Sequence, residues 1–333
     1  MQVLVIRPGA LGDVILTLPA LQALQEAWPD AVTEMMGRPA VLEWLLGRSV
    51  VQRVQSFDRS ELATLFAEGA GPGLWLRRYL KGFGLLLSYV GPAAQSFARN
   101  LARLAPGHVI TWDPRPPPGM RRHLSEYLQT PLQQLGVPTS AQPPRVRPTV
   151  EDEQGAAAWW SEQRLINQRV AAIHPGSGSP AKNWPAERFA ELAQHLQHEH
   201  GLHPLVLGAS VDESVVGMVV RDLADQPHTV LHNAPLSSLA AILVRCSIYI
   251  GNDSGISHLA AAVGVPTVAL FGPSDPAVWA PRGPSVRVVS GAAQCGPCEV
   301  EQRRACQHRA CLQAISTQDV LVAVRQAMSD STG

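Results

Sequence analysis

The sequence predicts an α/β protein made of two doubly wound parallel-sheet domains that face each other across a cleft. In both halves, short apolar segments alternate with helical patterns, which is the order of successive βαβ units. The apolar segments contain almost no polar residues, as expected for strands that helices cover on both faces. Loops rich in Gly and Ser follow several of these segments, so we expect ligands at the carboxyl ends of the strands.

The composition indicates a well-buried, soluble protein of two domains. Of its 333 residues, 46% are hydrophobic and 16% are charged. Lys+Arg and Asp+Glu both number 27, and this zero net charge argues against a nucleic-acid partner or attraction to acidic lipid. The longest apolar stretch, 74–90, is interrupted by Arg77, Arg78 and Lys81, and the N-terminus does not resemble a signal peptide. We therefore expect a cytoplasmic protein.

Proline-rich segments indicate where the domains meet. Prolines cluster at 115–119 and 137–148, and we interpret the second cluster as an interdomain linker. The expected parts are an N-terminal domain at 1–148, a C-terminal domain at 149–315, and a C-terminal helix and tail at 316–333. Ser316 or Thr317 is expected to cap the final helix, 320–328.

The first strand and loop place a carboxylate at a candidate site. Residues 2–6 form the strand, 7–13 the loop, and 14–28 a helix in which Pro19 marks a start or a kink. The glycines are spaced G-x-x-G, which is not a dinucleotide fingerprint. Asp13 is either a helix cap or a reactive carboxylate at the mouth of the loop.

The rest of the first half is predicted in outline only. We expect strands at 51–57, 85–89 and 109–112, and helices at 61–68, 95–104 and from 121 to about 135. Arg77, Arg78 and Lys81 are within helical reach of one another. They either bind an anionic acceptor or form a solvated helix face.

The second half carries a candidate diphosphate site. A helix at 152–163 precedes a strand at 170–173 and the small-residue loop 174–179, followed by Lys182 and a helix at 185–195. Backbone N–H groups, hydroxyls and one ammonium in such a loop can hold a diphosphate. After a further strand, 205–208, Asp212 and Glu213 are candidates to reach ribose hydroxyls.

A third βαβ unit strengthens this interpretation. It has strands at 248–250 and 267–271 around a helix at 256–263. In the loop 251–255, Ser254 can donate a hydroxyl and Gly255 allows close approach to the helix N-terminus. The alternative is that Asp253 or Ser254 only caps the helix. With Asp13 on one wall and Lys182 and 253–258 on the other, the pattern suits transfer of a group from a nucleotide diphosphate.

Three segments resemble the heptosyltransferase-like glycosyltransferases of family 9. They are V-L-V-I-R-P-G-A-L-G-D-V-I-L-T-L-P-A-L at 3–21, I-H-P-G-S-G-S-P-A-K-N-W-P at 173–185 and G-N-D-S-G-I-S-H-L-A-A-A-V-G-V-P-T-V-A-L-F-G at 251–272. The resemblance implies the two-domain glycosyltransferase-B fold. It also implies inverting, metal-independent transfer of a sugar, typically a heptose from ADP-heptose, onto a lipopolysaccharide core.

The resemblance implies roles for individual residues. Asp13 matches the catalytic base, and Lys182 matches the lysine that neutralises the donor diphosphate. The other positions implied in donor binding are Ser177, Ser179, Glu213 at the ribose, Asp253, Ser254, Gly255 and His258. The positions predicted to bind the acceptor are Gly12, Arg77, Arg78 and Arg122. Where many members carry an acidic residue and Gln-Gly, this chain has Ser-Tyr-Val-Gly at 88–91, which leaves the acceptor open.

Four cysteines are spaced C-x2-C-x7-C-x4-C. Cys295, Cys298, Cys306 and Cys311 are candidates for a structural zinc site. In a reducing cytosol, free thiols in a surface loop are the favoured interpretation, and no metal is expected to be required.

Three other functions are compatible with parts of this pattern. The chain is alternatively a non-catalytic nucleotide-binding protein of the same fold or a family 9 transferase using another nucleotide sugar. An NAD-dependent oxidoreductase ranks last because the G-x-G-x-x-G fingerprint is missing. As partners we expect a nucleotide-sugar donor and a lipid-linked glycan acceptor, with transient contact at the cytoplasmic membrane face and a monomeric state.

Overall fold

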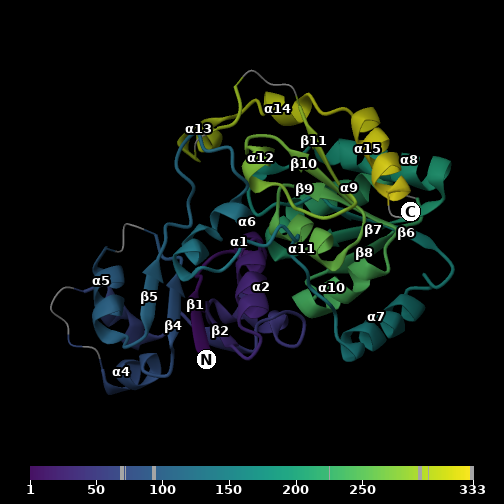
Figure 1. The fold of residues 1–333 in the computed structure, drawn as a ribbon. Helices are drawn as coiled ribbons and strands as arrows, with labels where there is room; N and C mark the ends of the chain where they lie inside the picture. Colours follow the sequence, from purple (N-terminus) through teal and green to yellow (C-terminus); the bar gives the residue numbers. More distant parts are fainter. Residues whose placement is uncertain are drawn as a thin grey trace. The chain divides into compact units, whose positions relative to one another are not determined.

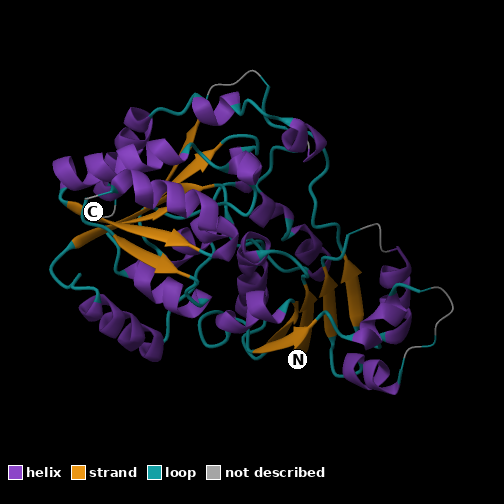
Figure 2. Ribbon diagram, turned by 180° about the vertical axis from the view of Figure 1, so that it is seen from behind, coloured by secondary structure: helices purple, strands orange, loops and turns teal. Residues whose placement is uncertain are grey.

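The computed structural model describes residues 1–67, 71, 73–91, 95–224, 226–291, 295–298 and 300–330. The chain divides into two compact units, Met1–Val146 (unit 1) and Arg147–Gly333 (unit 2). Each unit is a parallel sheet with helices packed on both faces, so the predicted α/β class with two parallel sheets is confirmed (Figures 1 and 2).

Unit 1 is built on a five-stranded parallel sheet in the order β3-β2-β1-β4-β5. The strands are β1 (Gln2–Ile6), β2 (Val32–Gly37), β3 (Arg53–Ser56), β4 (Leu85–Ser88) and β5 (His108–Thr111). Four of the five were predicted to within two residues at each end, whereas β2 was missed. The central position of β1 explains its apolar sequence, since both of its faces are covered.

The helix α5 (Gln95–Leu104) has the predicted bounds, whereas the other predicted helices of unit 1 are broken or shorter than expected. The expected helix 14–28 is two helices, because the chain breaks at Leu16–Thr17 and Pro19 sits in the first turn of α2. The segment 61–68 forms a 3₁₀ helix, η2, and residue 68 lies outside the described residues. The predicted helix from 121 begins only after His123, whose ring caps α6. The bounds are α1 (Leu11–Ile15), α2 (Leu18–Ala27), α3 (Pro39–Leu42), η1 (Glu43–Leu45), η2 (Ser60–Leu65), α4 (Leu74–Leu80), α5 (Gln95–Leu104), α6 (Leu124–Tyr127) and η4 (Thr130–Leu135).

Unit 2 contains a six-stranded parallel sheet in the order β11-β10-β9-β6-β7-β8. Its strands are β6 (Arg169–His174), β7 (Leu202–Gly208), β8 (Thr229–His232), β9 (Ile248–Asn252), β10 (Thr267–Phe271) and β11 (Val286–Ser290). Because β6 lies between β7 and β9, the loops that follow these three strands meet at one edge of the sheet.

The predicted helices of unit 2 are present and most are longer than expected. The helices α9, α10, α12, α13 and α14 were not predicted. Within the described ranges, none of the helices has the length and apolar character needed to cross a membrane. The bounds are α7 (Val150–Glu162), η5 (Pro180–Lys182), α8 (Ala186–His200), η6 (Ser210–Asp212), α9 (Glu213–Leu223), α10 (Leu236–Val244), α11 (Gly255–Val263), α12 (Pro276–Trp279), α13 (Val300–Ala305), α14 (Ala310–Gln313) and α15 (Thr317–Ser329).

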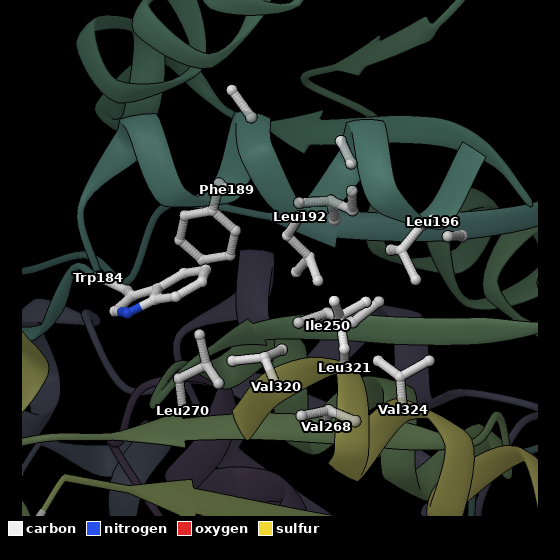
Figure 3. Packing of buried hydrophobic residues seen from close by; sticks show 14 of the residues in the cluster. Trp184, Phe189, Leu192, Leu196, Ile250, Val268, Leu270, Val320, Leu321 and Val324 are labelled. Carbon is white, nitrogen blue, oxygen red and sulfur yellow. The ribbon is translucent and has the colours of Figure 1, made fainter. Parts of the chain in front are cut away.

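The main core of unit 2 fixes the segment that carries Lys182. Trp184 is fully buried against Phe189 of α8 and packs with residues of β9, β10 and α15 (Figure 3). Its indole Nε1 donates to the carbonyl of Ile315 at 3.0 Å, just before α15. A buried aromatic side chain two residues after Lys182 therefore anchors the end of the candidate diphosphate loop.

The cap of α15 offers a test of the C-terminal helix. Ser316 and Asp319 form a capping box, with Ser316 Oγ accepting from Asp319 N at 3.2 Å and Asp319 Oδ2 accepting from Ser316 N at 3.0 Å. We expect Ser316→Ala to lower the free energy of unfolding by about 1 kcal/mol, measured by urea denaturation. Ser161→Ala, an exposed site within α7, is the control, because Ala is the better helix former there. Equal stability of the two variants would contradict the capping role.

Candidate functional site

In unit 1, Asp13 is held by hydrogen bonds to both carboxylate oxygens. It is the third residue of α1, and its Oδ2 accepts from the backbone N–H of Ala10 at 2.9 Å. Its Oδ1 lies 3.0 Å from Nη2 of Arg7, the first residue after β1. The Arg7 side chain is 5% exposed and that of Asp13 is 32% exposed. The carboxylate is therefore positioned from the buried side and remains accessible from solvent.

Arg7 is itself held in place by the first turn of the chain beyond Asp13. Its Nε donates to Thr17 Oγ1 at 3.3 Å, and that hydroxyl donates to the carbonyl of Asp13 at 2.8 Å. The pKa of Arg7 is lowered from its ordinary value, because the effect of burial outweighs the opposing effects of Asp13 and Tyr89. A guanidinium remains charged in such surroundings, so Arg7 places a positive charge 3.0 Å from the Asp13 carboxylate. This partner of Asp13 was not predicted from the sequence, although it lies in the same loop.

In unit 2, the structure brings together Lys182 and Asp253, which are 71 residues apart. Lys182 Nζ lies 2.6 Å from Asp253 Oδ2, and the two side chains are 21% and 8% exposed. Lys182 ends η5, and Asp253 directly follows β9. The ion pair thus joins the loops after two neighbouring strands.

The same loop begins α11 with Ser254 as its cap. Ser254 Oγ accepts from the N–H of Ser257 at 3.4 Å, so capping, which the sequence left open for Asp253 or Ser254, is a role of Ser254. Gly255 is the first residue of the helix, and His258 is buried in its body. The N-terminal N–H groups and the dipole of α11 favour an anion beside this cap.

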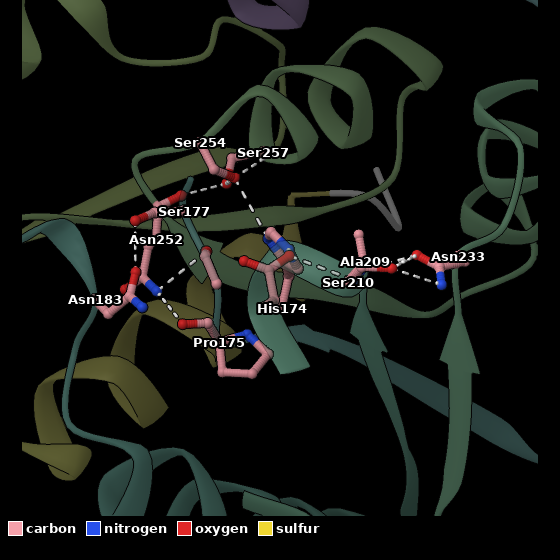
Figure 4. A network of polar contacts seen from close by, with 12 residues as sticks. His174, Pro175, Ser177, Asn183, Ala209, Ser210, Asn233, Asn252, Ser254 and Ser257 are labelled. Atoms are coloured by element: carbon pink, nitrogen blue, oxygen red, sulfur yellow. Dashed lines mark hydrogen bonds and ion pairs between the residues drawn. The ribbon is translucent and has the colours of Figure 1, made fainter. Parts of the chain in front are cut away.

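A buried histidine connects three loops at this edge of the sheet (Figure 4). His174 Nε2 lies 3.4 Å from Asp212 Oδ2, and its Nδ1 lies 3.5 Å from Ser254 Oγ. Asp212 also accepts from the N–H of Ala209 at 3.3 Å. A Cβ at Gly176 would lie 1.9 Å from Asp212 Oδ1, so only glycine fits there. Asp212 therefore points inward onto His174, while Glu213 is exposed in the first turn of α9.

Asn252 links the candidate diphosphate loop to the end of β9. Its side chain is fully buried and donates to the carbonyl of Pro175 at 2.7 Å (Figure 4). It also accepts from the N–H of Trp184 at 3.0 Å. Asn252 was not predicted as a site residue from the sequence. Within the loop, Ser177 Oγ donates to the carbonyl of Ser179 at 2.7 Å, so this hydroxyl shapes the loop.

The predicted acceptor residues lie on separate elements of unit 1. Arg77 and Arg78 are exposed in the last turn of α4, and Gly12 lies within α1 beside Asp13. Arg122 Nη1 donates to Thr130 Oγ1 at 3.1 Å, and its Nε lies 3.8 Å from Glu126. These contacts place Arg122 beside α6 and η4.

The cysteine cluster is a set of free thiols. Burial and the nearby Cys295 and Cys306 raise the pKa of Cys298, and burial raises the pKa of Cys311 with a contribution from Cys298. Over the described part of the chain, no three His, Cys, Asp or Glu side chains are arranged to hold a metal ion. The zinc alternative gains no support from this geometry.

Acid is expected to weaken the protein through Asp212. Burial raises the pKa of this carboxyl, but the hydrogen bond and charge of His174 and the N–H of Ala209 outweigh it, so the pKa is lowered. A carboxyl with a depressed folded-state pKa adds stability above its unfolded pKa, about 3.9, that is lost as the pH falls through the folded value.

We expect the free energy of unfolding in urea to fall between about pH 5 and pH 3, and Asp212→Asn to flatten this dependence. Asp30→Asn, at an exposed turn, is the control. An unchanged slope in the Asp212 variant would contradict the assignment.

Comparison with known proteins identifies the family. A model described as glycosyltransferase family 9 (heptosyltransferase) matches residues 111–308. The chain is 26% identical over 311 residues to lipopolysaccharide heptosyltransferase 2 of Escherichia coli K12, covering 87% of this chain and 88% of that protein.

Two solved structures share the fold across nearly the whole chain. The family 9 glycosyltransferase of Veillonella parvula superposes with a TM-score of 0.79 at 23% identity, covering 99% of this chain and 97% of that one. The E. coli ADP-heptose lipopolysaccharide heptosyltransferase II superposes with a TM-score of 0.77 at 21% identity, covering 100% of both chains. The family model spans more than half of the sequence, and the chain therefore belongs to glycosyltransferase family 9.

Proposed function

We propose that this protein transfers a heptosyl group from ADP-heptose to a hydroxyl of a lipopolysaccharide core, with inversion and without a required metal. The observation that carries this proposal is the ion pair of Lys182 with Asp253 beside the capped N-terminus of α11. An ammonium and a helix N-terminus together suit the two phosphates of a sugar nucleotide. The names of the relatives, which include an ADP-heptose enzyme, supply the sugar and the nucleotide.

The donor would be held by unit 2, acting as the C-terminal nucleotide-sugar domain. Lys182 would neutralise the diphosphate, and the N–H groups at Ser254 and Gly255 would bind its oxygens. In the present structure the ammonium of Lys182 forms an ion pair with Asp253. A bound diphosphate would therefore share Lys182 with this carboxylate. We assign Ser177, Ser179, Glu213 and His258 to the surroundings of the same donor.

The acceptor would be activated by unit 1. Asp13 accepts the proton of the acceptor hydroxyl, whose oxygen forms a bond to the anomeric carbon as the bond to the β-phosphate breaks. ADP leaves with the bonding electrons, and the Lys182 ammonium together with the N-terminus of α11 stabilises the charge that develops on it. Arg7 orients the carboxylate before this step. Gly12, Arg77, Arg78 and Arg122 are proposed to contact the anionic acceptor.

Because the proposed acceptor is linked to a lipid, the reaction would take place at a membrane surface. We infer that the protein works as a monomer at the cytoplasmic face of the membrane, with transient contact. The neutral net charge agrees with a contact that is brief.

The test is calorimetric titration with ADP, UDP, GDP and NAD, followed by transfer assays with ADP-heptose and a heptose-deficient lipopolysaccharide core. We expect selective binding of ADP and formation of the heptosylated product. Selective binding of another nucleotide would overturn the ADP-heptose donor while keeping the transfer chemistry. Binding of none would favour a non-catalytic protein.

A further inference from the structure

A cavity of about 720 Å³ lies in unit 2 between the diphosphate loop and the cysteine-bearing segment. Gly178, Ser179 and the following two residues form one wall. Arg303 of α13 and Arg309, the residue before α14, contribute the other wall with Cys306 and Gln307. The charged side chains of this lining are both arginines, so the cavity suits an anionic group.

Arg309 lies at the cavity in a backbone conformation that residues other than glycine seldom adopt. Its φ is 43° and its ψ is 41°, in the left-handed region. Its Nη1 donates to the carbonyl of Pro180 at 2.9 Å, which ties it to the opposite wall. Non-glycine residues in this conformation cluster at ligand sites, where the surrounding structure maintains the strain.

The two arginines lie in the unit of the chain that has a net negative charge. Unit 2 carries 13 Lys and Arg against 17 Asp and Glu, whereas unit 1 carries 14 against 10. A pair of guanidinium groups in one cavity is therefore not a by-product of a basic surface. It is a local concentration of positive charge on the acidic half of the chain.

The cavity shares Ser179 of the diphosphate loop with the proposed donor site, but not the groups proposed to bind the diphosphate. Lys182, Asp253, Ser254 and His258 do not line it, although Ser179 lies only three residues before Lys182. An anion bound here would belong to a molecule that approaches the donor closely while the diphosphate occupies Lys182.

We propose that this cavity binds a phosphate or carboxylate of the glycan acceptor through Arg303 and Arg309. The assignment to the acceptor rests on the proposed transferase function. The anion site itself does not, and it can be measured without turnover.

The test titrates glucose 6-phosphate into the protein saturated with ADP, with glucose and glucuronate as matched probes. The variants are Arg303→Ala and Arg309→Gly, because glycine keeps the left-handed backbone at 309 while removing the guanidinium. Arg325→Ala, at an exposed position of α15, is the control. We expect the phosphate probe to bind, each cavity variant to weaken it by about tenfold or more, and ADP affinity and the control to stay unchanged.

Transfer assays supply the second arm. Arg303→Ala is expected to raise KM for a phosphorylated core acceptor with kcat retained, and to leave KM for a dephosphorylated acceptor unchanged. Equal binding of glucose 6-phosphate by all variants, or its displacement by ADP together with weaker ADP binding in the variants, would overturn the proposal. Arginine-dependent binding by a protein that transfers no heptose would reject the proposed function and the acceptor assignment, but not the anion site.

Discussion

Replacing Asp13 with Asn is expected to lower kcat for heptose transfer by about 10²–10⁴-fold, the usual contribution of a general base. The amide has nearly the same shape as the carboxylate but cannot accept the proton of the acceptor hydroxyl. ADP affinity should be unchanged, because Asp13 belongs to unit 1 and the proposed donor groups belong to unit 2. Steady-state transfer assays and ADP titration of the same preparation check both parts.

Two further variants separate the chemistry of Asp13 from its position. In Gly9→Ala, the new Cβ would lie 2.5 Å from Asp13 Cβ, so the carboxylate is kept but must move. We expect a smaller loss of kcat than in Asp13→Asn, again with ADP affinity retained. Asp30→Asn, at an exposed turn of unit 1, should behave as the unaltered protein. An Asp13→Asn enzyme with more than about a tenth of the original kcat would contradict the role of base.

The strands whose bounds were predicted to the residue are two that consist almost entirely of apolar residues. Gln2–Ile6 and Thr267–Phe271 have the predicted bounds, because the centre of a parallel sheet admits few polar side chains. The strand β2 was missed since it contains Thr33 and Glu34, which read as polar. In the fold, Glu34 is buried and accepts a hydrogen bond from Tyr79 of α4, a partner 45 residues away. The pattern of apolar and polar residues within a strand cannot predict a hydrogen-bond partner so far away in the sequence.

The site was predictable to the extent that parallel-sheet topology governs it. The sequence placed Lys182 and 253–258 on one wall, and the structure joins Lys182 to Asp253 because β6 and β9 are neighbours. The contacts of His174 were not predictable in the same way. Asp212 and Glu213 are adjacent in sequence, and only the start of α9 decides that Asp212 turns inward. Spacing could not choose between two consecutive carboxylates.

The second large effect is expected for Lys182→Ala, which should weaken ADP binding by about 30-fold or more. Two changes act in the same direction. The diphosphate loses its ammonium partner, and the nearly buried carboxylate of Asp253 loses its counter-charge and repels the anion. Calorimetric titration at two ionic strengths measures the loss, which should shrink as salt increases.

Lys81→Ala is a closely matched control, because Lys81 and Lys182 are the two lysines among the 27 basic residues of the chain. Lys81 is exposed in unit 1, and its removal should leave ADP binding unchanged. The double variant Lys182→Ala/Asp253→Asn completes a cycle. If Asp253 repels the diphosphate once the ammonium is gone, the double variant binds ADP more tightly than Lys182→Ala alone. Equal ADP affinity in Lys182→Ala and Lys81→Ala would mean that the diphosphate does not bind at the Lys182–Asp253 pair, and the donor site would have to be placed elsewhere in the chain.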